Sequence, residues 1–164
     1  MASGASATES TIYPGVGIGK VKLGMTLGQV RRLLGPSQAV TARLRLAGGK
    51  QYVEYGWNFS EWRIGFIGRD TKRVALVATA FTRQRLSNDV GLGTTIETVR
   101  SKLPVACRIA DQDHAYRDPA TISYTYCTLA ATHGRKTVFI MHSKNCTQRH
   151  CDWFVGEVII REPF

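Results

Sequence analysis

The sequence predicts an α+β fold of two tandem repeats, each a short helix followed by an antiparallel sheet of three to four strands, with the helices on one face of the sheet. Residues 21–34 and 90–103 share seven of fourteen positions at a constant offset of 69. Both stretches have helical periodicity, and both precede segments rich in β-branched and aromatic residues. The expected organisation is a flexible N-terminal segment 1–14, repeat 1 at 15–85 and repeat 2 at 86–164, in one compact unit.

Each repeat opens with a predicted helix, which lies in the later part of the repeated stretch. Thr26 suits an N-cap because its hydroxyl can accept a hydrogen bond from the first turn, and Gln29 completes a capping box. In the second stretch, either Thr94 or Thr95 can be the cap. The apolar residues of each stretch share one helical face: Leu27, Val30 and Leu34, then Ile96, Val99 and Leu103. Helices this short need a sheet to pack on.

Strands are predicted after each helix. The first set covers residues 51–59, 62–67 and 73–81, and 41–50 is a candidate for one more short strand. The second set covers residues 121–129, 136–142 and 153–162. Residues 108–120 have the composition of a loop, and residues 142–152 form an insertion that repeat 1 lacks.

The chain is basic, with 22 Lys and Arg against 12 Asp and Glu, a net charge of +10. Residues 1–82 carry 11 basic and 4 acidic residues, and residues 83–164 carry 11 and 8, so the excess is spread along the chain. This balance favours anionic partners without choosing among acidic proteins, envelope polymers, lipid head groups and nucleic acid. No window has the eighteen or so apolar residues of a membrane span, so no integral membrane segment is expected.

Four cysteines, Cys107, Cys127, Cys146 and Cys151, lie in the second half. An even number suits disulfide pairing in an oxidising compartment. Proximity favours Cys146 with Cys151, which leaves Cys107 with Cys127, although three pairings are possible. The small polar N-terminal stretch lacks the order of an export signal and is typical of a mature chain whose leader has been removed. The alternative is a cytosolic protein with four free thiols.

The motif LGMT at 23–26, with QV at 29–30 and LLG at 33–35, resembles the opening of two related families. These are the beta-lactamase inhibitory proteins, which are secreted tandem repeats, and the small lipoproteins of the outer-membrane assembly machinery. Length and duplication favour the first family. The resemblance implies a bacterial, exported protein and a disulfide from the end of a helix to the next strand, for which Cys107 and Cys127 match. The equivalent pair is missing from repeat 1, and no inhibitory residue can be matched.

The sequence contains no catalytic signature, so neither an enzyme nor a cofactor is predicted. His142, Cys146, His150 and Cys151 are ligand types that suit zinc, but their spacing is unusual and a local disulfide is the simpler interpretation, so no metal site is predicted. The glycines at 15–19 precede Lys20 without the spacing of a phosphate-binding loop, and we interpret them as a lead into the first repeat.

Aromatic residues supply the candidate protein-binding face. If Cys127 points to the helices, alternation sends Tyr124 and Tyr126 to the opposite, open face of the sheet, and Tyr55 and Trp57 are their rough counterparts in repeat 1. These aromatics could instead pack an apolar layer. The register in repeat 1 also turns Glu54 toward the helices, and a shift of one residue would exchange the faces.

The predicted function is therefore a secreted or envelope-exposed, non-enzymatic module that binds a protein, with an acidic partner favoured and enzyme inhibition as one version. The alternative is binding of a polyanion through the basic surface. An anionic envelope polymer is then the more expected partner, and nucleic acid the less expected one.

Overall fold

The computed structural model describes residues 11–57, 61–80, 83–108, 125–144 and 151–163. Its two α-helices in these ranges are α1 (Leu27–Leu34) and α2 (Ile96–Lys102). The strands are β1 (Ile12–Tyr13), β2 (Gly17–Ile18), β3 (Val21–Lys22), β4 (Ala39–Arg45), β5 (Gln51–Trp57), β6 (Trp62–Gly68), β7 (Arg73–Thr79), β8 (Ala106–Arg108), β9 (Thr125–Ala130), β10 (Lys136–Lys144) and β11 (Asp152–Arg161).

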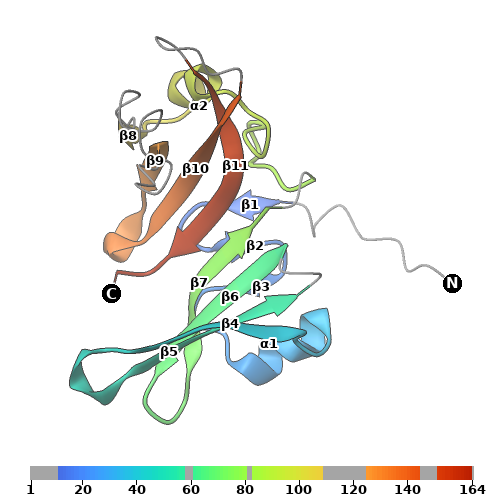
Figure 1. Ribbon diagram of the computed structural model, residues 1–164, viewed down its shortest axis with the longest axis vertical. Coiled ribbons are helices and arrows are strands. Elements are labelled where there is room, and N and C mark those ends of the chain that lie inside the picture. The colour runs from blue at the N-terminus through green and yellow to red at the C-terminus, as the bar shows by residue number, and fades with distance from the viewer. Residues whose placement is uncertain (1–10, 58–60, 81–82, 109–124, 145–150, 164) are drawn as a thin grey trace, which may run out of the picture.

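The strands form two sheets. The larger is an eight-stranded antiparallel sheet in the order β4-β5-β6-β7-β11-β10-β9-β8, and the smaller is a three-stranded sheet in the order β1-β2-β3. In both halves a helix precedes four strands that pair in chain order, and the two sets of four meet at β7 and β11. Figure 1 shows α1 and α2 near opposite ends of the molecule, with β1–β3 between them.

The predicted α+β class is wrong, because the described chain is mostly β and its two helices have only eight and seven residues. The two halves also share one sheet, since β7 pairs with β11 from Thr79↔Val158 to Leu76↔Arg161. Local sequence patterns identify strands but do not say which distant strands pair, so this join was not predictable from them.

The two repeated stretches dock on the last strand of their own half in the same way. The Gly24 N–H donates to the Val74 carbonyl at 2.8 Å, and the Gly93 N–H donates to the Val155 carbonyl at 2.8 Å. In each case the valine N–H donates back to the residue after the glycine. Both glycines have positive φ, +85° and +80°, which L side chains rarely adopt. Each helix therefore starts from an equivalent, fixed point on the sheet.

The predicted helix caps are confirmed. The Thr26 side chain accepts from the Gln29 N–H at 3.3 Å, and the Gln29 side chain accepts from the Thr26 N–H at 2.8 Å, which is a capping box. In the second half Thr95 is the cap and accepts from the Thr98 N–H at 3.4 Å. The neighbouring hydroxyl of Thr94 accepts an N–H of the turn before the helix.

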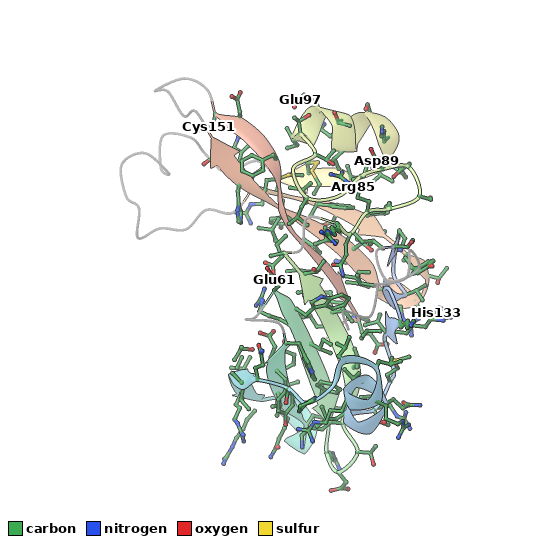
Figure 2. The ribbon with its side chains drawn as sticks, turned by 90° about the vertical axis from the view of Figure 1, so that its right-hand side faces the viewer. Glu61, Arg85, Asp89, Glu97, His133 and Cys151 are labelled. Carbon is green, nitrogen blue, oxygen red and sulfur yellow. A yellow bond between two sulfur atoms is a disulfide. The ribbon has the colours of Figure 1, made fainter. Side chains whose placement is uncertain are left out.

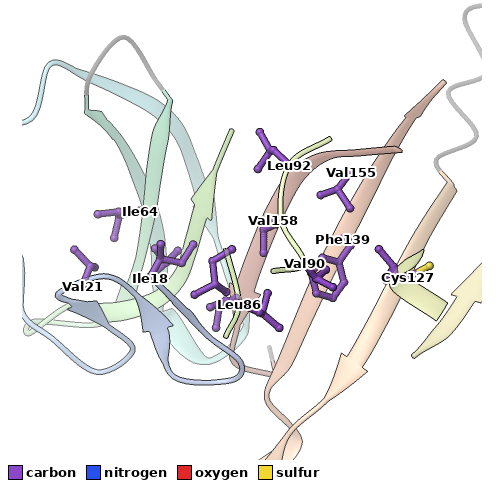
Figure 3. Packing of buried hydrophobic residues seen from close by; sticks show 14 of the residues in the cluster. Ile18, Val21, Ile64, Leu86, Val90, Leu92, Cys127, Phe139, Val155 and Val158 are labelled. Carbon is purple, nitrogen blue, oxygen red and sulfur yellow. The ribbon is translucent and has the colours of Figure 1, made fainter. Parts of the chain in front are cut away.

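A hydrophobic core fills the space between the eight-stranded sheet and a layer formed by the helices, β1–β3 and residues 86–92. It runs through both halves, from Val21 and Ile64 to Phe139 and Cys127, as Figure 3 shows. Because both halves contribute to this core, they fold as one body. Among the described residues, no helix has the length and apolar character needed to span a bilayer.

Cys107 and Cys127 form a disulfide, as predicted, and they lie directly opposite each other on β8 and β9. Cys151 is also disulfide-bonded, and its expected partner Cys146 lies outside the described residues. Figure 2 shows Cys151 at the end of the β10–β11 ribbon that lies away from His133. Because the Cys107–Cys127 disulfide joins β8 to β9, it fixes the β8 edge of the sheet covalently.

Candidate binding surface

The eight-stranded sheet has a second face, opposite the core, that we call the open face. On β5, Tyr55 and Trp57 point to the core side, and alternation sends Tyr52 and Glu54 to the open face. The same alternation places Arg63 of β6 on the open face, where it contacts Glu54.

A groove with a volume of about 540 Å³ lies on the open face. Most of its lining is apolar and comes from both halves, including Leu44, Leu76, Tyr126, Val138, Ile140 and Ile159. Lys136 and Arg161 add two cationic side chains to this lining. The volume lies in the range that accommodates a drug-sized ligand or a few protein side chains. The groove is therefore suited to a ligand that combines apolar groups with negative charge.

A polar network centred on Glu54 lies beside the groove. The Glu54 side chain is only 7% exposed, and its carboxylate accepts three hydrogen bonds. These come from the hydroxyl of Thr41 at 2.8 Å, the hydroxyl of Tyr52 at 2.6 Å and the guanidinium of Arg63 at 3.3 Å. The Arg63 guanidinium also pairs with Glu157. With its oxygens engaged in this way, Glu54 has a structural role.

The network joins the two halves across the middle of the sheet. Arg63 on β6 reaches over β7 to Glu157 on β11, and the residue opposite it on β7 is the small Ala78. Burial lowers the pKa of Arg63, but the hydrogen bonds and charges of Glu157 and Glu54 outweigh that effect and raise the pKa overall. Burial raises the pKa of the Tyr52 hydroxyl, and its bond to Glu54 raises it further, so Tyr52 stays a neutral donor. The network therefore carries one cation against two carboxylates.

The structure places Tyr55 and Trp57 on the core side rather than on the open face where the sequence put them. The Trp57 indole N–H donates to the Gly35 carbonyl, the C-cap of α1, at 3.0 Å. The guanidinium of Arg31, also on α1, lies 5.9 Å from the centroid of the Tyr55 ring. The physical reason is that alternate residues of β5 face opposite sides of the sheet. Glu54 finds its hydrogen-bond partners on the open face, so Tyr55 and Trp57 must face the core.

In the second half, the predicted assignment of residues to the two faces of the sheet agrees with the structure. Tyr126 lines the groove on the open face, while Cys127 is fully buried in the core. Tyr124 lies outside the described residues, as do Cys146 and His150 of the cluster weighed for zinc. Within the described ranges, no group of three or more His, Cys, Asp or Glu side chains is placed to hold a metal ion.

Sequence reasoning missed the network at Glu54 and the apolar lining of the groove. One signal was present, since Glu54 is the only charged residue of its strand and must find partners on one face. The groove had no such signal, because its lining residues come from six separate strands and the β4–β5 connection.

Comparison with known proteins gives a fold neighbour and no family. No family model matches the sequence, and no curated protein matches it. A solved structure, that of the uncharacterised protein YfeY from Escherichia coli, matches with a TM-score of 0.56 and 13% sequence identity. The match covers 94% of this chain and 100% of that chain. At this identity, what the chain shares with YfeY is the fold alone.

Proposed function

We propose that the protein is a non-enzymatic module that binds a protein partner on the open face of its eight-stranded sheet. The single observation that carries the proposal is the groove, which combines an apolar lining with the cations of Lys136 and Arg161. Tyr126 and Arg161 both line the groove, and tyrosine and arginine are enriched in protein interfaces. The partner places apolar side chains in the groove and carboxylates beside Lys136 and Arg161.

We also propose that the protein works outside the cytoplasm, in the cell envelope or secreted. The disulfide between Cys107 and Cys127 supports this, because structural disulfides are rare in the cytosol of mesophiles. The equivalent docking of the two repeated stretches supports an origin by tandem duplication. The resemblance of the LGMT motif to the beta-lactamase inhibitory proteins makes inhibition of an enzyme one form of the proposed function.

A phage-displayed random peptide library, selected on the wild-type protein, tests the proposal. Thr128 lines the groove, and Thr128→Glu adds a negative charge where we place the carboxylates of the partner. Thr71→Glu makes the same chemical change on an exposed turn outside the groove and is the matched control. We expect the selected peptides to be rich in Asp or Glu beside Phe, Trp or Leu. Thr128→Glu should weaken their binding by about tenfold or more, and Thr71→Glu should leave it unchanged.

Two results would overturn the proposal. One is that no selected peptide distinguishes Thr128→Glu from Thr71→Glu. The other is that binding disappears in about 0.5 M NaCl, where the Debye length falls to roughly 4 Å and only contacts that do not depend on long-range charge persist.

A second function, binding of a polyanion, is favoured by one observation. No acidic residue occurs between Glu9 and Glu54, and the exposed residues of this stretch include Arg32, Arg43 and Arg45. Binding of heparin, used as a model polyanion, would fall steeply as salt rises. Tight heparin binding with a steep salt dependence, together with no groove-dependent peptide, would favour this second function.

A further inference from the structure

We propose that the free edge of β4 accepts an extended acidic segment of the partner as an added strand. This inference rests on the proposed function and specifies how the partner is held. β4 is an end strand of the eight-stranded sheet, and among the described residues it pairs with β5 alone. Its other side therefore presents backbone N–H and C=O groups that can hydrogen-bond to another strand.

The exposure of β4 fits an edge that receives a partner. Six of its seven residues are exposed, and only Ala42 is half-buried. Two of the most exposed large apolar residues among the described residues, Val40 at 42% and Leu44 at 59%, lie on this one strand. A register shift between Val40 and Ala42 interrupts the regular pairing, so the regular part of the edge is residues 42–45.

The side chains of this edge alternate in chemistry from one face to the other. Leu44 points to the open face and lines the groove, opposite Tyr52 on β5. Arg43 and Arg45 point to the other face and are both exposed. The edge is thus continuous with the groove on one side and cationic on the other.

This alternation defines the sequence that an added strand must carry. Residues directly opposite on neighbouring strands interact, and opposite charges stabilise the pair. A partner strand should therefore carry an acidic residue opposite Arg43, an apolar residue opposite Leu44 and an acidic residue opposite Arg45. The same two arginines disfavour pairing with β4 of a second copy, because like charges would then lie close together. The charges of Arg43 and Arg45 therefore favour an acidic segment of another protein as the strand that pairs with β4.

A synthetic peptide in which Glu and Val alternate, flanked by Ser and Thr and labelled with fluorescein, is the probe. Two matched peptides accompany it, one with Lys in place of Glu and one with N-methylated amides along its backbone. We expect the acidic peptide to bind in a fluorescence anisotropy titration, and its contacts in amide NMR spectra to centre on β4. The lysine peptide and the N-methylated peptide should each bind at least about tenfold more weakly.

The double variant Arg43→Glu/Arg45→Glu tests the protein side. This variant should bind the acidic peptide about tenfold or more weakly than the wild type does, and it should bind the lysine peptide instead. Arg32→Glu/Arg100→Glu changes the net charge equally at two exposed helix positions and should leave binding unchanged. Circular dichroism checks that both variants are folded.

Three outcomes would overturn the inference. Equal binding of the N-methylated peptide would mean that charge alone attracts the probe, without strand pairing. Equal binding by Arg43→Glu/Arg45→Glu, or displacement of the probe by heparin with no shift of β4 amides, would place the contact elsewhere. Peptides from the phage selection that depend on the groove are also tested on Arg43→Glu/Arg45→Glu. If they bind this variant normally, the inference that the partner pairs with β4 is wrong, but the proposed function stands.

Discussion

Tyr52 shows, at the scale of a single residue, how burial sets the chemistry of the open face. Its ring lies across Gly65 of β6, where a Cβ would come within 2.4 Å of it, and its hydroxyl donates to Glu54. Burial raises the pKa of the Tyr52 hydroxyl, followed by the hydrogen bond to Glu54 and its charge, while the charge of Arg63 lowers it. Tyr52 is therefore held as a neutral donor that Glu54 needs.

This raised pKa predicts a loss of stability at alkaline pH. Because the pKa of Tyr52 is higher in the folded state, its contribution is fully present below the unfolded value of about 10 and is lost as pH rises above it. We expect the free energy of unfolding of the wild type to fall between about pH 10 and pH 12, and to fall less in Tyr52→Phe. Urea denaturation at each pH measures both slopes.

Tyr126→Phe is the matched control, because it removes a hydroxyl from another tyrosine of the same face. Above pH 10, Tyr52→Phe should lose less stability than either the wild type or Tyr126→Phe. If Tyr52→Phe and Tyr126→Phe lose stability with the same slope as the wild type, the alkaline transition does not arise from Tyr52, and the prediction is wrong.

Single residues also show where sequence reasoning reached its limit. In the second half a buried cysteine, Cys127, indicated the correct parity of its strand, and Tyr126 was placed on the correct face. In the first half the aromatic residues favoured the wrong face, because aromatics fit either face of a sheet, and the position of Glu54 was only a reason to consider a shift of one residue. The charged Glu54 was the better guide, because burial of a carboxylate demands hydrogen-bond donors and therefore identifies its face.

Gly24 and Gly93 show, at the scale of elements, what the sequence repeat encodes. Both have positive φ, and neither has another atom within 4 Å of the place where a Cβ would lie. An alanine at either position would therefore meet no clash, and its cost would come only from the backbone conformation. We expect Gly24→Ala and Gly93→Ala each to lower the free energy of unfolding by about 1 kcal/mol, measured by urea denaturation.

Gly28 in α1 provides the control for this pair. It is exposed, and a Cβ at this position would meet only the Thr26 hydroxyl oxygen, at 4.0 Å, which is an ordinary contact. Gly28→Ala should raise stability by up to about 1 kcal/mol, because alanine favours the helical conformation more than glycine does. Equal effects of alanine at all three positions would show that the positive φ of Gly24 and Gly93 is not what the repeat preserves.

The elements that the sequence predicted best have strong local signals. The helices were found through Thr26, Thr95 and their apolar faces, and the long strands through their composition. The two-residue strands β1–β3 were missed, since a pair of residues has no measurable period. β1 falls within residues 1–14, which are predicted to be flexible, and the glycines at 15–19 are interpreted only as a lead into the first repeat. Ile12 and Ile18 are nevertheless buried in the core.

The Glu54–Arg63–Glu157 network acts at the scale of the whole molecule, because it connects strands of both halves. Arg63→Met should lower the free energy of unfolding by about 2 kcal/mol, less than for a fully buried pair because the Arg63 side chain is 35% exposed. Most of this loss should come from the two carboxylates that are left without their shared cation, since an unpaired buried charge is costly.

The double variant Arg63→Met/Glu54→Gln separates this explanation from a simple loss of packing. Glutamine removes the unpaired charge, so the double variant should recover part of the stability that Arg63→Met loses. Urea denaturation of the four proteins in this cycle gives the coupling free energy. A double variant that loses the sum of the two single losses would show that the two side chains are not coupled.

The fold class was mispredicted at this largest scale. Their content of β-branched and aromatic residues identified β7 and β11 as strands, and both are strands in the structure. Their mutual pairing depends on residues far apart in the chain, and it turns two expected sheets into one. The site follows from that pairing, since the groove takes its lining from both halves. A function that depends on such a surface therefore cannot be recognised from the sequence of any single segment.

The pairing of β7 with β11 also has a consequence for the order of folding. Its partners, from Thr79↔Val158 to Leu76↔Arg161, are about eighty residues apart, whereas the hairpins on either side join strands that are adjacent in the chain. Closing a long loop costs more conformational entropy than closing a short one. We therefore expect the hairpins to form early and the encounter of the two halves to limit the rate of refolding. During synthesis, the sheet can close only after β11 has been made.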